Sequence, residues 1–352
     1  MSVAAPIVWR NQKLELLDQR LLPQQEVMVV CETLESAHDA IRDMVVRGAP
    51  CIGFTALYGL SLWLKAQSKF SIGDLKQAAT FLKGARPTAV NLMYEVDRVV
   101  KSVETKFTTA DDIKKVFEFV LSDAHLQMEL SQSKNTKMAE LALKDLTDLY
   151  GDRPLTLMTH CNTGFLACGT LGTALGVISH AHSKKRVQKV YADETRPYMQ
   201  GTRLTAYELG KEGIPYQLVV EGAASYLFSH HKVDAIFVGA DRIAANGDTA
   251  NKVGTSTLAI VAHHYKVPFY VVAPLSSFDF STPNGKGIEI ELRHESEILS
   301  YQGKLVAPAG ARALNPSFDV TDSRFISGII CENGLVKNPS LESMKVLQRG
   351  SH

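Results

Sequence analysis

The sequence predicts an α/β protein with a small, mostly helical N-terminal domain that includes a short β-sheet, followed by a Rossmann-like, doubly wound parallel-sheet domain. Two observations support this prediction. Residues 1–150 hold long segments whose apolar residues recur about every 3.6 positions. Residues 151–348 instead alternate short β-prone runs with helical segments, as βαβ units do. The final four residues, 349–352, resemble an expression-tag remnant and are left out of the fold.

The N-terminal part begins with β-prone segments and continues with helices. Short alternating segments within residues 8–17 and a β-rich run at 26–30 predict a small antiparallel sheet. Helical spacing follows, with Ser, Thr or Asp near several helix starts as capping residues. The expected helices are 36–46, 52–66, 74–82, 89–103 and 109 to about 149.

The C-terminal part reads as a series of βαβ units. The expected strands are 155–160, 187–192, 216–220, 235–239 and 269–273, and the expected helices lie near 170–182, 201–212, 223–231 and 254–265. Open parallel sheets bind ligands beyond the carboxyl ends of their strands. Polar loops follow three of these strands, starting at His160, Asp193 and Asp241. We therefore expect the three loops to meet over one crevice.

Composition narrows the class of partner. The 352 residues include 38 Lys and Arg against 37 Asp and Glu, a formal charge of +1, which is too balanced to hold nucleic acid or an acidic membrane without specificity. No apolar run approaches the roughly 20 residues that span a bilayer, and the start lacks a secretory signal pattern. We expect a cytoplasmic protein with a small-molecule partner, and neither a nucleic-acid nor a membrane partner.

Several common sites are not predicted. The five cysteines are dispersed without a C-x-x-C pair, so reduced thiols are expected rather than disulfides or structural zinc. The first strand-to-helix turn reads C-N-T-G and lacks the dinucleotide-binding glycine pattern, and no G-x-x-x-x-G-K-[ST] phosphate loop is present. The histidine pairs at 230–231 and 263–264 lack a completing ligand pattern, so no metal site is expected.

Cys161 and Asp241 are the candidate catalytic residues. Cys161 ends a predicted strand before a predicted helix, where backbone N–H groups and the helix dipole could stabilise a thiolate that acts as a base; the alternative is a small buried apolar residue. Asp241 follows an apolar run, so desolvation should raise its pKa and keep a proton available. A helix cap or an ion pair with Arg242 is the alternative for Asp241, and Asp248 also fits an ordinary turn.

Three basic segments are candidates for binding a phosphate. The Arg47-Gly48-Ala49 turn combines a guanidinium with backbone N–H groups that a glycine leaves accessible. Arg86 lies in a second basic turn. Asn251 and Lys252 are expected to start a helix, whose N-terminus favours anions. Each signal alone fits a solvated turn, whereas convergence of the three would indicate a phosphate site.

The motifs together resemble one enzyme family. The segments are V-R-G-A-P (46–50), A-R-P-T-A-V-N-L (85–92), T-H-C-N-T-G (159–164), E-T-R-P-x-x-Q-G-T-R-L-T-A-x-E-L (194–209) and G-A-D-R-I-A-A-N-G-D-T-A-N-K-V-G-T (239–255). They resemble the methylthioribose-1-phosphate isomerases, with a likeness that extends from about residue 8 to 330. That family shares a superfamily with the regulatory subunits of a translation initiation factor's exchange complex and with ribose-1,5-bisphosphate isomerases.

The resemblance implies a cofactor-independent aldose–ketose isomerase, an intramolecular oxidoreductase, that forms homodimers and acts in methionine salvage. Its catalytic pair carries over to Cys161 and Asp241. Its substrate-binding positions carry over to Arg47, Gly48, Ala49, Arg86, Gln200, Asn251 and Lys252. Two alternatives remain open: an isomerase of 5-deoxyribose 1-phosphate or ribose 1,5-bisphosphate, and a non-catalytic regulatory subunit of the same superfamily.

Overall fold

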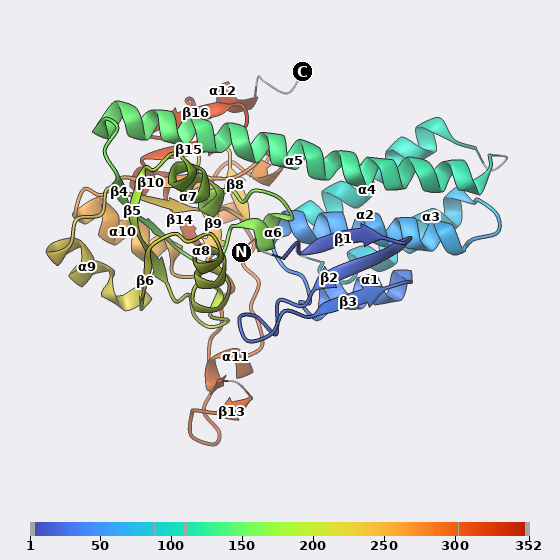
Figure 1. Cartoon of the computed structure of the whole chain (residues 1–352), viewed down its shortest axis with the longest axis horizontal. Helices are drawn as coiled ribbons and strands as arrows, with labels where there is room; N and C mark the ends of the chain where they lie inside the picture. Colours follow the sequence, from blue (N-terminus) through green and yellow to red (C-terminus); the bar gives the residue numbers. More distant parts are fainter. Residues whose placement is uncertain (1–3, 88, 109–110, 302, 349–352) are drawn as a thin grey trace. The chain divides into compact units, whose positions relative to one another are not determined.

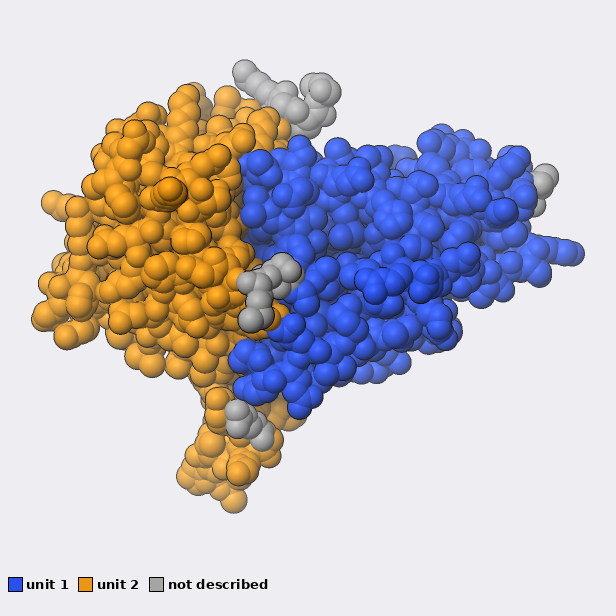
Figure 2. All heavy atoms as spheres, viewed as in Figure 1, with its two compact units in different colours: residues 1–136, 163–172 blue, residues 137–162, 173–352 orange. Residues whose placement is uncertain are grey.

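The computed structural model describes residues 4–87, 89–108, 111–301 and 303–348 (Figure 1). The chain divides into two compact units, which Figure 2 colours blue and orange. The first unit holds residues 1–136 and 163–172, and the second holds 137–162 and 173–352. The division therefore falls inside a helix and returns for a ten-residue insertion, whereas the boundary expected from sequence near residue 150 is where that helix ends.

The first unit combines a small antiparallel sheet with a group of helices, as the sequence predicts. Its sheet has the order β1-β2-β3, with strands β1 (Ile7–Arg10), β2 (Lys13–Leu17) and β3 (Met28–Cys31). Its helices are α1 (Leu34–Arg42), α2 (Ala49–Ala66), α3 (Ile72–Lys83), α4 (Val90–Lys106), the first part of α5 (Ile113–Tyr150) and α6 (Phe165–Cys168). Helix α2 is apolar on nearly all sides and contacts α1, α3 and α4, so it forms the centre of this unit's core.

The second unit is built on a seven-stranded sheet in the order β16-β15-β10-β7-β4-β5-β6. Its strands are β4 (Leu155–Thr159), β5 (Val187–Asp193), β6 (Tyr216–Val219), β7 (Ala235–Val238), β10 (Phe269–Val272), β15 (Gly328–Cys331) and β16 (Gly334–Lys337). All neighbouring pairs are parallel except β15–β16. The chain runs outward from β4 through β5 to β6 and then returns to β7, so the doubly wound sheet reverses direction between β4 and β7.

Helices and buried strands complete this unit. Strands β7 and β10 are buried along their whole length, as expected for a parallel sheet covered on both faces. Its helices are the last part of α5, α7 (Ala174–Ser183), α8 (Ala206–Lys211), α9 (Ala224–His230), α10 (Thr255–His264), α11 (Ser296–Leu299) and α12 (Lys345–Gln348). A π-helical segment, η1 (Gly201–Thr205), precedes α8, and single 3-10 turns occur at η2 (Glu221–Ala223), η3 (Leu275–Ser277), η4 (Gly285–Gly287) and η5 (Ser323–Phe325).

A second sheet in this unit was not predicted from the sequence. It has the order β11-β8-β9-β14, with β8 (Arg242–Ala244), β9 (Thr249–Lys252), β11 (Phe278–Asp279) and β14 (Phe318–Thr321); a separate hairpin joins β12 (Ser300–Tyr301) to β13 (Lys304–Leu305). The prediction that Asn251 and Lys252 start a helix is wrong. Both lie in β9, which pairs with the distant β14, and α10 starts only after Gly254. None of the described helices is both long and apolar enough to cross a lipid bilayer.

A buried carboxylate joins the start of β4 to the start of β7. Asp234 accepts hydrogen bonds from the Arg153 guanidinium at 3.1 Å and from the Thr156 N–H at 2.9 Å. Burial alone would raise the pKa of Asp234, but these donors outweigh burial and hold the pKa below its ordinary value. Its stabilising effect is therefore present above the unfolded-state pKa and is lost as pH falls through the lower folded-state value.

We expect Asp234→Asn to lower the free energy of unfolding by about 2 kcal/mol at pH 7, because charged hydrogen bonds are lost at a buried site. Urea unfolding between pH 8 and 3.5 should show a constant difference from wild type down to about pH 5, which narrows below about pH 4. Asp152→Asn is the matched control, since Asp152 is exposed and its ion pair with Arg186 should contribute under about 0.5 kcal/mol. Equal effects of the two substitutions would contradict the assignment.

Candidate active site

Three neighbouring strands of the large sheet end in the loops that carry the site. Cys161 follows β4, Asp193 ends β5 and Asp241 follows β7. In the ladder, Thr159 of β4 lies opposite Ala192 of β5 on one side and Phe237 of β7 on the other. The three loops therefore leave the same edge of the sheet from adjacent strands, at the point where the winding reverses. In doubly wound sheets this is where ligands bind.

The backbone of Cys161 is held in an uncommon conformation. Its φ angle is +63°, in the left-handed region that residues other than glycine seldom adopt. Its N–H donates to Thr195 Oγ1 at 2.8 Å, and its carbonyl accepts from Thr205 Oγ1 at 2.5 Å. Such strain persists only where the surroundings enforce it, and it clusters at functional sites. Side chains from two other segments thus fix the direction in which Cys161 leaves the sheet.

The expected helix dipole beside Cys161 is weak. The sequence predicted one helix over residues 170–182, whereas the structure has a single turn at Phe165–Cys168 and a separate helix at Ala174–Ser183. A helix of one turn that begins four residues after Cys161 has little dipole to offer, because that field acts mainly within the first turn of a helix. The hydroxyl groups of Thr195 and Thr205, rather than a helix N-terminus, shape this loop.

Asp241 is half-buried at the entrance to the second sheet. Its N–H donates to the carbonyl of Ala250 at 2.9 Å, which holds the loop after β7 against β9. The neighbouring Arg242 lies 4.0 Å from the carboxylate of Asp279. Asp248 occupies the β8–β9 turn, where its carboxylate accepts the N–H groups of Gly285 and Ser323. Asp248 is thus a structural turn residue.

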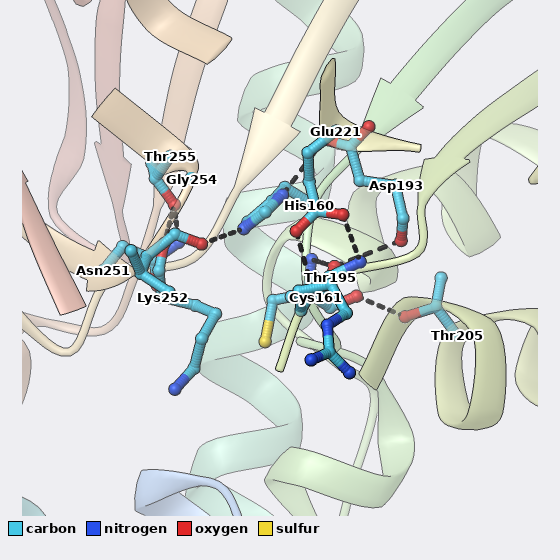
Figure 3. A network of polar contacts seen from close by, with 12 residues as sticks. His160, Cys161, Asp193, Thr195, Thr205, Glu221, Asn251, Lys252, Gly254 and Thr255 are labelled. Atoms are coloured by element: carbon cyan, nitrogen blue, oxygen red, sulfur yellow. Dashed lines mark hydrogen bonds and ion pairs between the residues drawn. The ribbon is translucent and has the colours of Figure 1, made fainter. Parts of the chain in front are cut away.

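Asn251 and Lys252 reach the same region from β9. The buried amide of Asn251 donates to Thr255 Oγ1 at 2.9 Å, and Lys252 Nζ lies 4.8 Å from the centre of the Phe318 ring. Figure 3 shows the Cys161 sulfur and the Lys252 amino group pointing to the same side of the polar network. A strand therefore presents the lysine here, in place of the helix N-terminus that the sequence suggested.

Gln200 lies at the start of η1, a π-helical segment of the kind that is frequent at functional sites. The residue is buried, and its side-chain oxygen Oε1 has no hydrogen-bond partner within the described part of the chain. Buried acceptors are almost always satisfied in folded proteins. This oxygen is therefore suited to accept a hydrogen bond from a ligand hydroxyl or a water molecule.

The four remaining predicted residues belong to the first unit. Gly48 precedes α2 with a φ angle of +91°, and a Cβ at this position would lie 2.4 Å from the carbonyl oxygen of Ala167. Only glycine fits such a close backbone approach. Arg47 is buried immediately before Gly48, Ala49 is the first residue of α2, and Arg86 lies half-buried between α3 and α4. Thr88 of the predicted basic turn falls outside the described residues.

A buried polar network beside Cys161 was not predicted from the sequence. His160 Nδ1 lies 3.0 Å from Asp193 Oδ2, and its Nε2 lies 3.0 Å from the carbonyl oxygen of Val253 (Figure 3). Glu221 accepts the N–H groups of Thr195 and Arg196. The available sequence signal was positional: a histidine directly before the candidate cysteine and an aspartate at the end of the next strand.

Comparisons with known proteins agree in fold and sequence along nearly the whole chain. The model of the initiation factor 2 subunit family matches residues 45–338. A methylthioribose-1-phosphate isomerase of Marinobacter nauticus is 44% identical over 96% of this chain and 95% of its own. One from Thioalkalivibrio sulfidiphilus is 46% identical over 97% and 96%.

Solved structures extend the agreement to three dimensions. The 5-methylthioribose 1-phosphate isomerase of Pyrococcus horikoshii aligns with a TM-score of 0.90 and 35% identity, covering 99% of this chain and 97% of that chain. The translation initiation factor eIF-2B, subunit delta, of A. fulgidus aligns with a TM-score of 0.85 and 33% identity, covering 98% of this chain and 100% of that chain. By sequence and fold, this chain therefore belongs to the initiation factor 2 subunit family, and within it to the methylthioribose-1-phosphate isomerases.

Proposed function

We propose that this protein converts 5-methylthioribose 1-phosphate, an aldose, into the ketose 5-methylthioribulose 1-phosphate, a step of methionine salvage. The observation that carries the proposal is the 44–46% identity, over almost the full length, to enzymes named for this substrate. The reaction moves hydrogen within one molecule, so it calls for an acid, a base and a phosphate site rather than a redox cofactor.

The substrate determines which groups are needed. Its anomeric oxygen carries the phosphate, so the ring cannot open by simple loss of a hydroxyl proton, and an acid must protonate the ring oxygen. We assign that role to Asp241, with Cys161 thiolate moving a proton from C2 to C1. The proton released by the 2-hydroxyl as the ketone forms balances the one gained by the ring oxygen and returns Asp241 to its acid form. Adjacent strand ends at the winding reversal support this pairing.

The remaining predicted residues are assigned to binding. Arg47, Arg86 and Lys252 are proposed to neutralise the phosphate, with the backbone N–H groups around Gly48 and Ala49 as further donors. Gln200 and Asn251 are proposed to bind the substrate's oxygens. The unsatisfied buried acceptor of Gln200 supports its assignment. A hydride shift from C2 to C1 is the competing chemical route, in which Cys161 would contribute less.

One observation favours a second candidate function. The A. fulgidus protein at 33% identity is named as an initiation factor subunit, so a non-catalytic regulatory subunit that binds sugar phosphates is the alternative of another class. Closer alternatives are the isomerases of 5-deoxyribose 1-phosphate and ribose 1,5-bisphosphate. A regulatory subunit predicts ligand binding without turnover, whereas the related isomerases predict turnover of a different sugar.

The proposal also covers the cellular location and the oligomeric state of the protein. We place the enzyme in the cytoplasm as a homodimer that has no nucleic-acid or membrane partner. The five cysteines are buried and lie outside any disulfide, and the formal charge is +1, which supports a reducing compartment and a small-molecule partner. Sedimentation equilibrium gives the assembly directly, because a dimer has twice the 38.6 kDa mass of the chain.

Turnover of 5-methylthioribose 1-phosphate is the first expected result. The protein is incubated separately with this sugar, 5-deoxyribose 1-phosphate and ribose 1,5-bisphosphate, and the loss of the anomeric proton and the appearance of the C1 methylene of the ketose are followed by NMR. Conversion of the methylthio sugar with the highest kcat/KM supports the proposal. Preference for another sugar reassigns the substrate, and binding without conversion favours the regulatory subunit.

Cys161→Ser and Asp241→Asn should each lower kcat by at least about 100-fold, because each removes a proton-transferring group. Cys331→Ser is the matched cysteine control, since Cys331 is a buried thiol at the end of β15. Asp248→Asn is the matched acid control, because Asp248 anchors a turn through backbone N–H groups. A variant at 161 or 241 with near-normal turnover would remove that residue from the mechanism.

Solvent deuterium should enter C1 of the sugar if Cys161 carries the proton. The isomerisation is reversible, so holding the mixture at equilibrium in deuterated water for many turnovers accumulates the label even when each turnover exchanges little. Mass spectrometry and proton NMR at C1 measure the label. A fully protonated C1 after many turnovers would instead support the hydride shift.

A further inference from the structure

The His160 side chain joins three segments of the candidate site. The residue itself follows β4 and precedes Cys161, its Nδ1 contacts Asp193 at the end of β5, and its Nε2 contacts the Val253 carbonyl between Lys252 and α10. The imidazole is fully buried, and Asp193 is 1% exposed. Figure 3 shows the Cys161 sulfur and the Lys252 amino group on one side of this network. The ring is therefore a spacer between the proposed base and a proposed phosphate ligand.

The hydrogen bonds of the ring fix the number of protons in the pair. A carbonyl oxygen can only accept, so the Val253 contact requires a hydrogen on Nε2. The Nδ1–Oδ2 contact of 3.0 Å then needs a hydrogen of its own. Either the ring is an imidazolium facing a carboxylate, or a neutral ring accepts from a protonated Asp193. Both forms hold one shared proton and carry no net charge, which suits a site closed to water.

The close packing of the ring restricts the turn after Lys252. Gly254 has a φ angle of +102°, and a Cβ there would lie 2.8 Å from His160 Cε1. The Gly254 N–H donates to Asp319 Oδ2 at 2.7 Å, and the Ser256 N–H donates to Asp319 Oδ1 at 3.0 Å. The turn thus lies between the imidazole on one side and a carboxylate on the other. A change in the ring's orientation would move the turn and, with it, Lys252.

The charged groups around the ring favour retention of the shared proton. They are Asp193 of β5, Glu221 of η2 and Asp319 of β14. Burial opposes a charge on His160, but the hydrogen bond and negative charge of Asp193 outweigh burial and raise the pKa of the histidine. Burial raises the pKa of Asp193, and Asp193 Oδ1 lacks a hydrogen-bond partner among the described residues. The raised pKa of His160 and the raised pKa of Asp193 both favour retention of the shared proton.

We propose that His160 and Asp193 are positioning residues: a buried imidazole–carboxyl pair that shares one proton and sets the spacing between the Cys161 loop and the turn after Lys252. This inference rests on the proposed function for its catalytic consequence. The pair itself touches no reacting atom. It acts by holding the loop of the proposed base and the turn of the proposed phosphate ligand in one arrangement.

The shared proton determines whether the stabilising effect of the His160–Asp193 pair is lost at low or at high pH. The folded pair keeps a proton that the unfolded chain releases above the ordinary histidine pKa of about 6.5. Its contribution is therefore complete below that pH and is lost as pH rises through the raised folded-state pKa. Loss of the proton leaves one ring nitrogen without a hydrogen, so that a lone pair faces either Asp193 Oδ2 or the Val253 carbonyl and one of the two contacts that hold the loops together is lost. Activity and stability should fall together on the alkaline side.

Substitutions at Asp193 separate this role from a general packing role. Asp193→Ala removes the partner of Nδ1 and should lower kcat by about 10- to 100-fold, by analogy with the loss of residues that orient a metal ligand through a hydrogen bond. Asp193→Asn should recover most of that loss, because its amide donates to a neutral ring without any shared proton. For the same reason its alkaline loss of kcat/KM should be shifted to higher pH than in wild type.

Substitutions at His160 separate the two ends of the ring. An asparagine amide extends about as far as Nδ1 and a glutamine amide about as far as Nε2. His160→Asn should therefore keep the Asp193 contact, release the Val253 turn and chiefly raise KM. His160→Gln should keep the Val253 contact and chiefly lower kcat. Asp145→Asn is the matched control, since buried Asp145 accepts from the Tyr270 hydroxyl and should lower stability without changing the shape of the pH profile.

A spectroscopic measurement tests, independently of turnover, whether His160 and Asp193 share a proton. In ¹⁵N-histidine-labelled protein, the ring signal of His160 is assigned by its absence from the spectrum of His160→Gln. In wild type this signal should not titrate between pH 6 and 8. In Asp193→Asn it should show the chemical shifts of a neutral ring. Titration of His160 in wild type near pH 6.5 would overturn the shared proton. Wild-type kinetics in Asp193→Ala would overturn the positioning role. If wild type converts none of the sugars, the proposed function fails, and the histidine spectra alone decide on the pair.

Discussion

The parallel pairing of β4 with β7 is the constraint on which the site depends. These strands are far apart in the chain and meet only because the winding of the sheet reverses between them. Their ladder sets Thr159 opposite Phe237, and this register fixes where the loops with Cys161 and Asp241 begin. A slip of one residue would turn every side chain of one strand to the other face, and a slip of two would shift one loop by about 6.6 Å. The buried apolar residues of both strands oppose such slips.

Much of the large sheet could be predicted from the sequence because its signals are local. β7 and β10 are short, wholly apolar runs bounded by polar loops, and such runs indicate buried strands in parallel sheets whatever surrounds them. The long helix α5 likewise shows its own periodicity. The loops at the strand ends followed from the sheet, and for this reason Cys161, Asp193 and Asp241 could be assigned to one edge before any coordinates.

The parts that sequence analysis missed depend on distant partners. β9 is four residues long, and it is a strand because β14 pairs with it from more than 60 residues away. Nothing within the Asn251–Lys252 segment distinguishes that outcome from a helix start. His160 is similar: its importance lies in hydrogen bonds to residues 33 and 93 positions away. A histidine beside a cysteine has no such meaning until those partners are known.

One boundary between the two units of the chain lies within the Cys161 loop. The second unit ends its segment at Asn162, the next residue after Cys161, and the chain enters the first unit at Thr163 before returning after Gly172. Only Asn162 thus separates the candidate base from a segment of the first unit, the unit that also contains Arg47 and Arg86. The chain passes from one unit to the other at three points, and at one of them Thr163 lies two peptide bonds from Cys161, so the backbone of the candidate base is joined covalently to the unit that contains both arginines.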